Sequence, residues 1–274
     1  MAIRTRIAPT PSGYLHSGNA LAFLHTARRA RELGASLLLR IDDMDRERVR
    51  PEYIQDVFDT LDFLRIHPNE GPASSADFEA CWSQRLRMHL YSEMLGQLAA
   101  QNAVYACTCT RSQLQSNASE GYPGTCRNKN IPLHTLGAAW RLRTDPGVAV
   151  RMRLPDGAHS ASTLPPAQHD FIVRKKDGFP AYQLCSLADD VHFEVDYIVR
   201  GADLRDSTWA QLYLARVLGC SSFEACTFEH HPLVYDSAGM KLSKSAGAAS
   251  IKHWRESGAT LEALLRSTDN AFYP

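Results

Sequence analysis

The amino-acid sequence lacks any long hydrophobic run. No apolar segment approaches the roughly 18 residues that a membrane-spanning helix needs, although 44% of all residues are hydrophobic. Residues 1–9 carry Arg4 and Arg6 and contain no apolar stretch of the kind found in secretory signal peptides. From these absences we expect a cytoplasmic protein that does not bind a membrane.

The chain also lacks net charge, because 30 lysines and arginines balance 30 aspartates and glutamates. This balance excludes a uniformly basic protein that coats nucleic acid, but it allows a local basic surface. Residues 105–180 contain ten basic and five acidic side chains, which gives this segment a formal charge of +5 and the remainder −5. We expect the segment to face a polyanion such as RNA; the alternative is a chance excess of basic side chains.

The cysteines do not suit a disulfide framework. Seven is an odd count, and without a secretory signal reduced thiols or a metal site are expected. Cys107 and Cys109 form a C-x-C pair, and Cys126 follows within 20 residues. This spacing is typical of a structural zinc site, which takes four tetrahedral ligands. His134 is the conventional candidate for the fourth ligand, and three reduced thiols in a core are the alternative to a metal.

Strand and helix patterns alternate along the chain. Strands are predicted at 4–8, 36–41, 197–199 and 231–235, and helices at 19–33, 51–64, 86–102, 208–218 and 261–266. This order predicts an α/β fold with a parallel sheet and right-handed crossovers. Residues 105–180 instead contain several prolines and short alternating runs, which predict a smaller β-rich insertion.

Residues 11–19 have the composition of a phosphate site. They join the first predicted strand to the first predicted helix, at the sheet edge where ligands bind in doubly wound folds. Amides at the start of a helix attract phosphate; His16 and Asn19 could donate to it, and Gly18 would let it approach closely. Neither the P-loop nor the dinucleotide glycine motif is present. A purely structural turn is the alternative.

A second segment, residues 239–245, places Lys241, Ser243 and Lys244 on a loop that begins with glycine. Two ammonium groups and a hydroxyl suit a triphosphate. A solvated basic loop is the alternative for this segment taken alone.

Together, the two segments resemble the two signatures of class I aminoacyl-tRNA synthetases. Residues 16–19 (HSGN) match the HIGH signature, and residues 241–245 (KLSKS) match KMSKS with Leu for Met. Residues 6–16 (RIAPTPSGYLH) are similar to R-F-A-P-S-P-T-G-x-L-H of the glutamyl branch, and residues 40–45 (RIDDMD) to its R-I-E-D-x-D. The resemblance extends over essentially the whole chain, with further matches at 82–85 (WSQR) and 199–204 (VRGADL).

The resemblance implies a Rossmann-like parallel sheet with a small zinc-bearing insertion and a short C-terminal helical tail. It divides the chain into a Rossmann-like catalytic half at 1–104, an acceptor-binding-like insertion at 105–180, a second catalytic half at 181–240, and a signature loop with its tail at 241–274. Only 29 residues follow Ser245, so we expect no anticodon-binding domain.

The activity that the resemblance implies is that of an ATP-dependent ligase. The zinc motif and the short tail are similar to those of the short glutamyl-tRNA synthetase-like family. That family activates L-glutamate with ATP and Mg²⁺ without tRNA, and transfers glutamate to queuosine at the wobble position of tRNA(Asp). Such an enzyme would be a monomer with one structural Zn²⁺. The alternatives are a free-standing glutamyl-adenylate former that loads a carrier protein or small molecule, and a non-catalytic RNA-binding paralogue.

By resemblance, glutamate would contact six residues: Arg6, Ala8, Thr10, Asp42, Tyr182 and Arg200. The two arginines would bind carboxylates, and Asp42 would bind the ammonium. Thr10 stands where the family has Ser. Asp42 stands where the glutamyl branch has Glu and the glutaminyl branch has Asp, which leaves the amino-acid identity open. Arg6 and Arg200 favour glutamate, because a neutral amide would not compensate two buried guanidiniums.

By the same resemblance, ATP would contact His16, Gly18, Asn19, Lys241, Ser243 and Lys244. His16 and Lys244 would stabilise the charge on the leaving pyrophosphate, and Lys241 would help to close the loop. The family also has a C-x-C…Y-x₃-C zinc site, which implies Tyr122 as the fourth ligand in place of His134.

Overall fold

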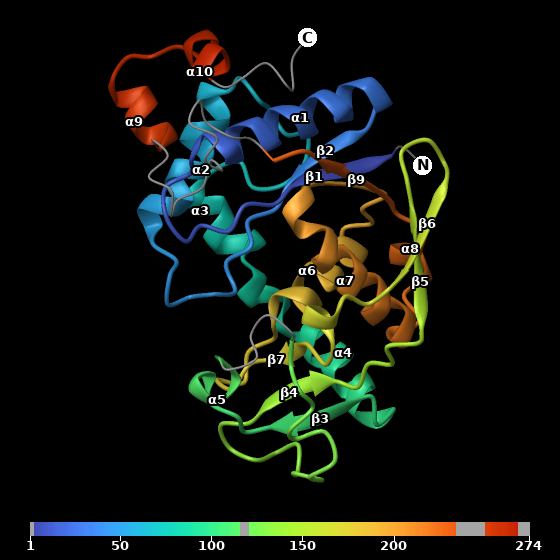
Figure 1. Cartoon of the computed structure of the whole chain (residues 1–274). Helices are drawn as coiled ribbons and strands as arrows, with labels where there is room; N and C mark the ends of the chain where they lie inside the picture. Colours follow the sequence, from blue (N-terminus) through green and yellow to red (C-terminus); the bar gives the residue numbers. More distant parts are fainter. Residues whose placement is uncertain (1–2, 116–120, 234–249, 268–274) are drawn as a thin grey trace. The chain divides into compact units, whose positions relative to one another are not determined.

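A computed structural model describes residues 3–115, 121–233 and 250–267 (Figure 1). The chain forms two compact units. The first contains Met1–Leu86, Tyr197–Asp203 and Glu229–Pro274, and the second contains Arg87–Asp196 and Leu204–Phe228. Within the described ranges, no helix is long and apolar enough to cross a membrane.

The first unit is organised around parallel strands. β1 (Arg4–Ile7) pairs in parallel with β2 (Ser36–Leu39) and with β8 (Tyr197–Gly201). The helix α1 (Ser17–Leu33) connects β1 to β2 and packs against these strands, as Figure 1 shows. All three strands are largely buried, which explains their continuous apolar pattern. The predicted parallel α/β arrangement is confirmed.

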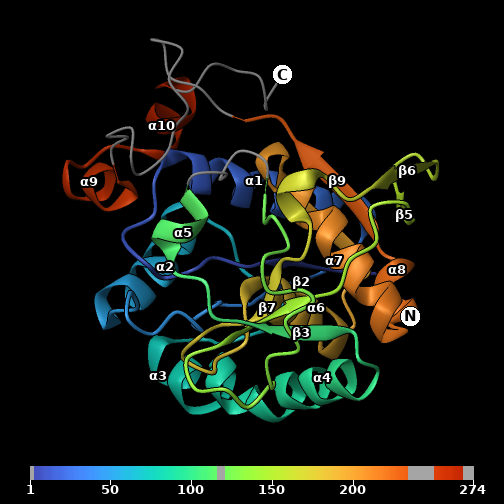
Figure 2. The same ribbon diagram turned by 60° about the horizontal axis from the view of Figure 1, so that its bottom comes forward.

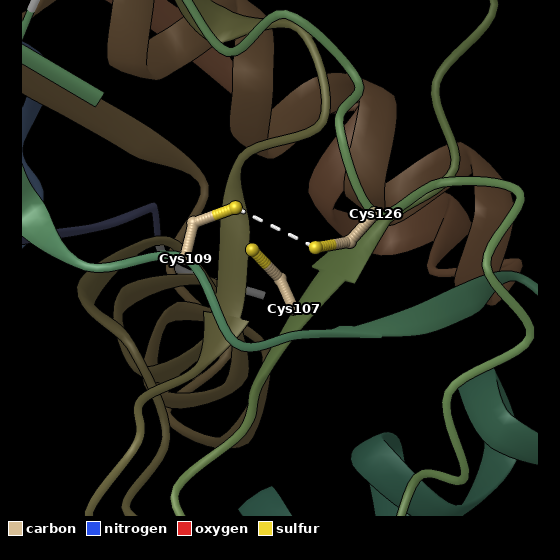
Figure 3. A group of neighbouring side chains, drawn as sticks. All are labelled: Cys107, Cys109 and Cys126. Carbon is tan, nitrogen blue, oxygen red and sulfur yellow. Dashed lines mark hydrogen bonds between the residues drawn. The ribbon is translucent and has the colours of Figure 1, made fainter. Parts of the chain in front are cut away.

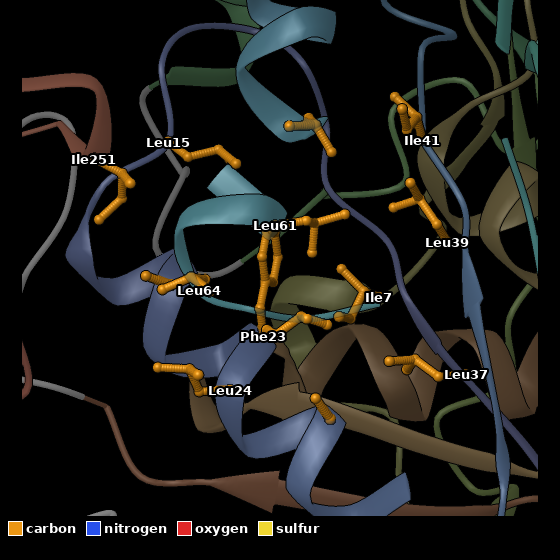
Figure 4. Packing of buried hydrophobic residues seen from close by; sticks show 14 of the residues in the cluster. Ile7, Leu15, Phe23, Leu24, Leu37, Leu39, Ile41, Leu61, Leu64 and Ile251 are labelled. Atoms are coloured by element: carbon orange, nitrogen blue, oxygen red, sulfur yellow. The ribbon is translucent and has the colours of Figure 1, made fainter. Parts of the chain in front are cut away.

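The hydrophobic core of this unit lies between α1, the strands and α2 (Pro51–Phe63) (Figure 4). Phe23 and Leu24 of α1 face this cluster, and Leu61 of α2 meets them. The short helices α9 (Ile251–Glu256) and α10 (Leu261–Ser267) add one buried side chain each, Ile251 and Leu264. Full burial of a Leu or Phe side chain stabilises a fold by roughly 1.5–3 kcal/mol.

Local sequence signals explain where α1 ends and where α2 begins. α1 ends at Gly34, whose φ of 59° is left-handed and costs glycine nothing. α2 begins with proline, which suits the first turn of a helix. The turn before α4 contains short helical segments, α3 (Ser75–Asp77), η1 (Phe78–Trp82) and η2 (Gln84–Arg87).

The second unit contains an antiparallel sheet in the order β3-β4-β7. Its strands are β3 (Val104–Cys107), β4 (Ala139–Leu142) and β7 (Ile172–Arg174). A hairpin of β5 (Ala149–Arg153) and β6 (His159–Thr163) extends away from this sheet in Figures 1 and 2. The β-rich character predicted for residues 105–180 is therefore confirmed.

Helices complete the second unit. They are α4 (Met88–Ala100), α5 (Arg111–Gln115), α6 (Tyr182–His192), α7 (Arg205–Leu218) and α8 (Ser221–Glu224), with η3 (Pro166–Gln168) in a loop; of η4 (Ala202–Leu204), only Leu204 belongs to this unit. A buried ion pair joins Arg87, the N-cap of α4, to Asp189 of α6 at 2.9 Å. Tyr91 donates a 2.8 Å hydrogen bond to the same carboxylate.

One strand prediction is wrong in position. The strand expected at 231–235 is β9, which runs from Thr227 to His231. Its middle residues are polar, and the prediction followed the apolar residues after it instead. Glu229 is tolerated because it pairs with His25 at 2.7 Å and with Arg29 at 2.8 Å, both on α1. The strand therefore contains polar residues that are stabilised by distant partners, and a search for hydrophobic residues alone does not find it.

Candidate functional site

The predicted glutamate residues of the first unit lie where β1 and β2 end. Beyond the strands, the N–H of Arg40 donates to the carbonyl of Ile7 and that of Asp42 to Pro9, each at 2.9 Å. These bonds extend the parallel pairing, so Ala8 lies alongside residues 40–42. The carboxyl edge of the sheet therefore brings together residues more than 30 positions apart in the sequence.

Arg6 and Arg200 are both buried, with 4% and 5% of their surface exposed. Nη1 of Arg6 donates a 3.1 Å hydrogen bond to the carbonyl of Val199, the residue before Arg200. The Arg6 guanidinium therefore lies against β8, at the position next to Arg200. Guanidinium groups bind carboxylates with two parallel hydrogen bonds, so this part of the unit suits an anionic ligand.

Asp42, the predicted ammonium partner, is held by an arginine that sequence reasoning had not singled out. Arg40 donates from Nε at 2.7 Å and from Nη2 at 3.0 Å to the two carboxylate oxygens of Asp42. The pair is buried. Each carboxylate oxygen has more than one acceptor position, so this pairing orients Asp42 without by itself excluding an ammonium group.

Asp43 is a second anchor that sequence reasoning missed. It is fully buried and accepts hydrogen bonds from Ser83 Oγ at 2.7 Å and from the N–H of Gln84 at 2.8 Å. Gln84 in turn accepts from the N–H of Met44 at 2.8 Å. These bonds tie the RIDDMD segment to the WSQR segment, and the joint presence of both motifs was the available signal.

His16 and Asn19 build the start of α1. His16 is the N-cap, and its Nδ1 accepts a 3.1 Å hydrogen bond from the N–H of Gly18. Asn19 Oδ1 accepts a 3.1 Å bond from the N–H of His16, which completes a capping box. An accepting Nδ1 places the ring proton on Nε2. The first signature therefore fixes its own backbone and sets the histidine tautomer.

The remaining predicted ATP and glutamate residues are either not described by the structure or are exposed. Lys241, Ser243 and Lys244 lie outside the described residues. Thr10 is exposed. Tyr182 begins α6 in the second unit, with 44% of its surface exposed.

The three predicted metal-binding cysteines converge in the second unit (Figure 3). Cys107 ends β3, and the sulfur atoms of Cys107, Cys109 and Cys126 all lie within 4.8 Å of one another. Cys109 and Cys126 approach to 3.5 Å, as the dashed line in Figure 3 marks. Among the described residues, no other group of His, Cys, Asp or Glu side chains gathers three ligand atoms so closely.

The side chain of Tyr122 also lies at this cluster. Its hydroxyl oxygen lies 3.4 Å from the sulfur of Cys107 and 3.9 Å from that of Cys109. It also accepts a 2.8 Å hydrogen bond from the N–H of Cys126. His134 is exposed and is not part of the group. Three sulfurs and one phenol oxygen therefore meet, which is a donor set that fits four-coordinate zinc.

The local electrostatics favour a thiolate at Cys126. Burial raises the pKa of this thiol, but hydrogen bonds from the Thr108 backbone and the Tyr122 hydroxyl outweigh burial and lower the pKa to about 7. Burial raises the pKa of Cys109 and of Tyr122. A zinc ligand must be deprotonated, and the lowered pKa of Cys126 favours that state near neutral pH.

The family follows from comparison with known proteins. Residues 2–273 match the model of the class I tRNA synthetases (E and Q), catalytic domain. The chain belongs to this family. It is 37% identical over 272 residues to the glutamyl-Q tRNA(Asp) synthetase of Cupriavidus metallidurans, a match that covers 95% of this chain and 82% of that protein. It is 36% identical over 273 residues to the protein of the same name from Nitratidesulfovibrio vulgaris, covering 93% and 82%.

Solved structures agree on the fold. The glutamate-tRNA synthetase of Elizabethkingia anophelis superposes with a TM-score of 0.73 at 21% identity, over 90% of this chain and 53% of that chain. A glutamate tRNA ligase of Elizabethkingia meningosepticum in complex with its amino acid gives 0.71 at the same identity. This chain spans about half the length of these two proteins. The predicted fold and the predicted class, an ATP-dependent ligase of the class I synthetases, are confirmed.

Proposed function

We propose that this protein activates L-glutamate with ATP, without tRNA, and transfers the glutamyl group to queuosine at the wobble position of tRNA(Asp). The observation that carries the proposal is the burial of Arg6 and Arg200 on the neighbouring strands β1 and β8, with the Arg6 guanidinium bonded to the carbonyl of Val199, in a chain of this family. The relatives named glutamyl-Q tRNA(Asp) synthetase support the second step.

Glutamate matches this site by charge. It carries two carboxylates and one ammonium. The site offers the buried guanidiniums of Arg6 and Arg200 for the carboxylates and, for the ammonium, the carboxylate of Asp42, which also pairs with Arg40. Glutamine would offer only one carboxylate to the two guanidiniums, and a neutral amide compensates a buried positive charge less well than a carboxylate does. Tyr182 is the proposed hydrogen-bond partner of the substrate, with Ala8 and Thr10 lining the site.

The first step is attack of a glutamate α-carboxylate oxygen on the α-phosphorus of ATP. The bond to the bridging oxygen breaks, and its electron pair leaves with pyrophosphate. The Nε2–H of His16 and the ammonium of Lys244 stabilise the charge on that leaving group. Lys241 helps to close the loop, and Gly18, Asn19 and Ser243 complete the ATP contacts. Mg²⁺ bound to ATP supplies further charge neutralisation.

In the second step, a hydroxyl of queuosine attacks the carbonyl carbon of the adenylate, and AMP leaves. No side chain serves as a nucleophile in either step, so catalysis comes from positioning and electrostatics. The basic segment 105–180 is the proposed contact for the RNA, because phosphate neutralisation dominates such interfaces.

The cysteine cluster is the proposed site of one structural Zn²⁺. Cys107, Cys109, Cys126 and Tyr122 would hold the ion, which would join β3 to the loop around Cys126. The supporting observation is the convergence of three sulfurs and the Tyr122 hydroxyl. The proposed enzyme is a cytoplasmic monomer.

The test uses labelled glutamate, ATP and two tRNA pools, one containing queuosine and one prepared without it. We expect label in tRNA only from the queuosine-containing pool. Glutamate-dependent ATP–pyrophosphate exchange should also occur in a third reaction that contains no tRNA. Exchange with no tRNA labelling would instead favour an enzyme that loads a carrier protein or small molecule. Labelling that is independent of queuosine would contradict the proposal.

A further inference from the structure

Asp56 is a buried carboxylate on α2 that takes no part in the proposed chemistry. The residue is 2% exposed, and its Oδ2 accepts a 2.8 Å hydrogen bond from the backbone N–H of Leu15. Its Oδ1 accepts a 2.5 Å bond from Nη2 of Arg255 on α9. Leu15 directly precedes His16, so Asp56 connects the first signature to a helix 240 positions later in the chain.

The carbonyl of Leu15 is bound from the same helix. The N–H of Ile251 donates to it at 2.7 Å, and Ser250 forms an isolated antiparallel bridge with His16. Leu15 and Ile251 are buried in one hydrophobic cluster, and Figure 4 shows them side by side. Both polar backbone groups of Leu15 are therefore held, the N–H by Asp56 and the carbonyl by α9.

Two cations of α9 strengthen this contact. Nη1 of Arg255 pairs with Asp59 on α2 at 2.7 Å. Lys252 donates a 3.1 Å hydrogen bond to the hydroxyl of Tyr14, and its ammonium lies 4.4 Å from the ring centre. The two residues before His16 are therefore both held: Leu15 by its main chain and Tyr14 by its side chain.

A carboxylate as buried as Asp56 is retained only where its oxygens are paired or hydrogen-bonded. Burial raises the pKa of Asp56, while the Leu15 N–H and the charge of Arg255 favour its ionised form. Asp56, Leu15 and Arg255 therefore depend on one another: removing the carboxylate leaves a buried N–H without its acceptor and Arg255 without its shorter ion pair.

We propose that Asp56 is a positioning residue that holds the His16 turn against α9, through the Leu15 N–H and Arg255. The inference rests on the proposed function in one respect, namely that His16 contacts ATP. Ser250 follows the second signature by five positions and forms its bridge with His16. A shift of about 1 Å in a catalytic group can reduce a rate by about 100-fold.

The variants Asp56→Ala and Asp56→Asn separate positioning from general destabilisation. Ala removes both contacts, whereas the Asn amide oxygen can still accept the Leu15 N–H. We expect glutamate-dependent ATP–pyrophosphate exchange to fall about 100-fold for Ala and about tenfold for Asn, with the KM for glutamate unchanged. Asp59→Asn is the matched control, since it removes the other ion pair of Arg255 but no bond to Leu15; we expect it to stay within about threefold of the unaltered chain.

A double-mutant cycle with His16→Ala distinguishes an effect of Asp56 through His16 from a general loss of structure. The measured quantity is the ATP–pyrophosphate exchange rate of the single and double variants. If Asp56 acts through His16, adding Asp56→Ala to His16→Ala should reduce the rate little further. A full, multiplicative loss in that background would overturn the proposal, as would an Asp56→Ala protein that folds and exchanges at the unaltered rate. If Asp56→Ala does not fold, Asp56→Asn is used in the same cycle with the same criterion.

Amide hydrogen exchange tests the contact independently of activity. The Leu15 N–H should exchange faster in Asp56→Ala than in Asp59→Asn, and Asp56→Asn should restore part of the protection. Equal protection of Leu15 in all three variants would overturn the proposal. Absence of ATP–pyrophosphate exchange in the unaltered protein would refute the proposed function instead, and Leu15 protection would then decide the inference alone.

Discussion

The two candidate sites of this protein are built in opposite ways. The cysteine cluster takes its ligands from within 20 residues of chain, whereas the strand-end site of the first unit draws on Arg6, His16, Asp42 and Arg200. Closing a longer stretch of chain costs more entropy. The strand-end site is accordingly held by buried polar anchors, Asp43 among them, while the cysteine cluster needs only a strand end and a loop.

This difference between the two sites determines how each can be found in a sequence. A local cluster shows itself in its spacing, because the chain between its ligands is too short to separate them far. A distributed site shows itself only through motifs that resemble those of known enzymes. The experiments on Lys244, Cys107 and Tyr122 below test whether the predicted ATP and glutamate residues carry the chemistry and the cysteine cluster the local stability.

The largest effect is expected from Lys244→Ala. Loss of one charged group that stabilises the transition state typically reduces a rate by about 100- to 1,000-fold. Glutamate-dependent ATP–pyrophosphate exchange should fall by this amount while glutamate binding changes little. Lys129→Ala, an exposed lysine of the second unit, is the control and should leave exchange unaltered. An unchanged exchange rate in Lys244→Ala would refute the assigned role.

The second experiment is Cys107→Ser, measured by zinc content and thermal unfolding. We expect loss of the bound ion and a lower melting temperature, because structural zinc contributes directly to folding. Cys81→Ser is the control, since Cys81 is exposed and belongs to the other unit. Full zinc content in Cys107→Ser would show that the ligand assignment is wrong.

The third experiment concerns Glu229 in the first unit, whose pKa is lowered to about 2. Burial raises the pKa of this carboxyl group, but hydrogen bonds from His25 and Tyr197 and the charge of Arg29 outweigh burial. Because the folded pKa lies below the unfolded value, Glu229 stabilises the fold above about pH 4.5. This contribution, on the order of 3 kcal/mol, is lost as the pH falls toward 2. Glu229→Gln should flatten the acid part of a stability–pH curve, measured by urea unfolding. A curve parallel to that of the unaltered protein would contradict this.

The smallest expected effect distinguishes the two candidates for the fourth zinc ligand. Tyr122→Phe keeps the ring under Arg141, 3.6 Å from the ring centre, but removes the ligand oxygen. Zinc affinity should fall about tenfold, as measured by competition with a chelator. His134→Ala should leave affinity unchanged. The opposite pattern would restore His134 as the ligand.

Several features were predictable because they depend on nearby residues. The parallel α/β order, the β-rich insertion and the grouping of the cysteines all follow from local patterns, and the structure contains them. β9 was misplaced because Glu229 and His230 interrupt its apolar pattern. The partners that make Glu229 acceptable, His25 and Arg29, lie about 200 positions earlier, where no local pattern includes them.

The sequence by itself determined the class of fold, the two signatures and the three thiols that converge, because periodicity and short spacing act over a few residues. Residue spacing left Tyr122 and His134 open, and only the family resemblance and the tertiary structure favour Tyr122. Tertiary structure alone decided that Arg40 holds Asp42, and that Asp56 and α9 hold Leu15. These choices depend on which distant segments the folded chain brings within hydrogen-bond distance, and burial then makes each such bond specific, since an unpaired buried group is costly.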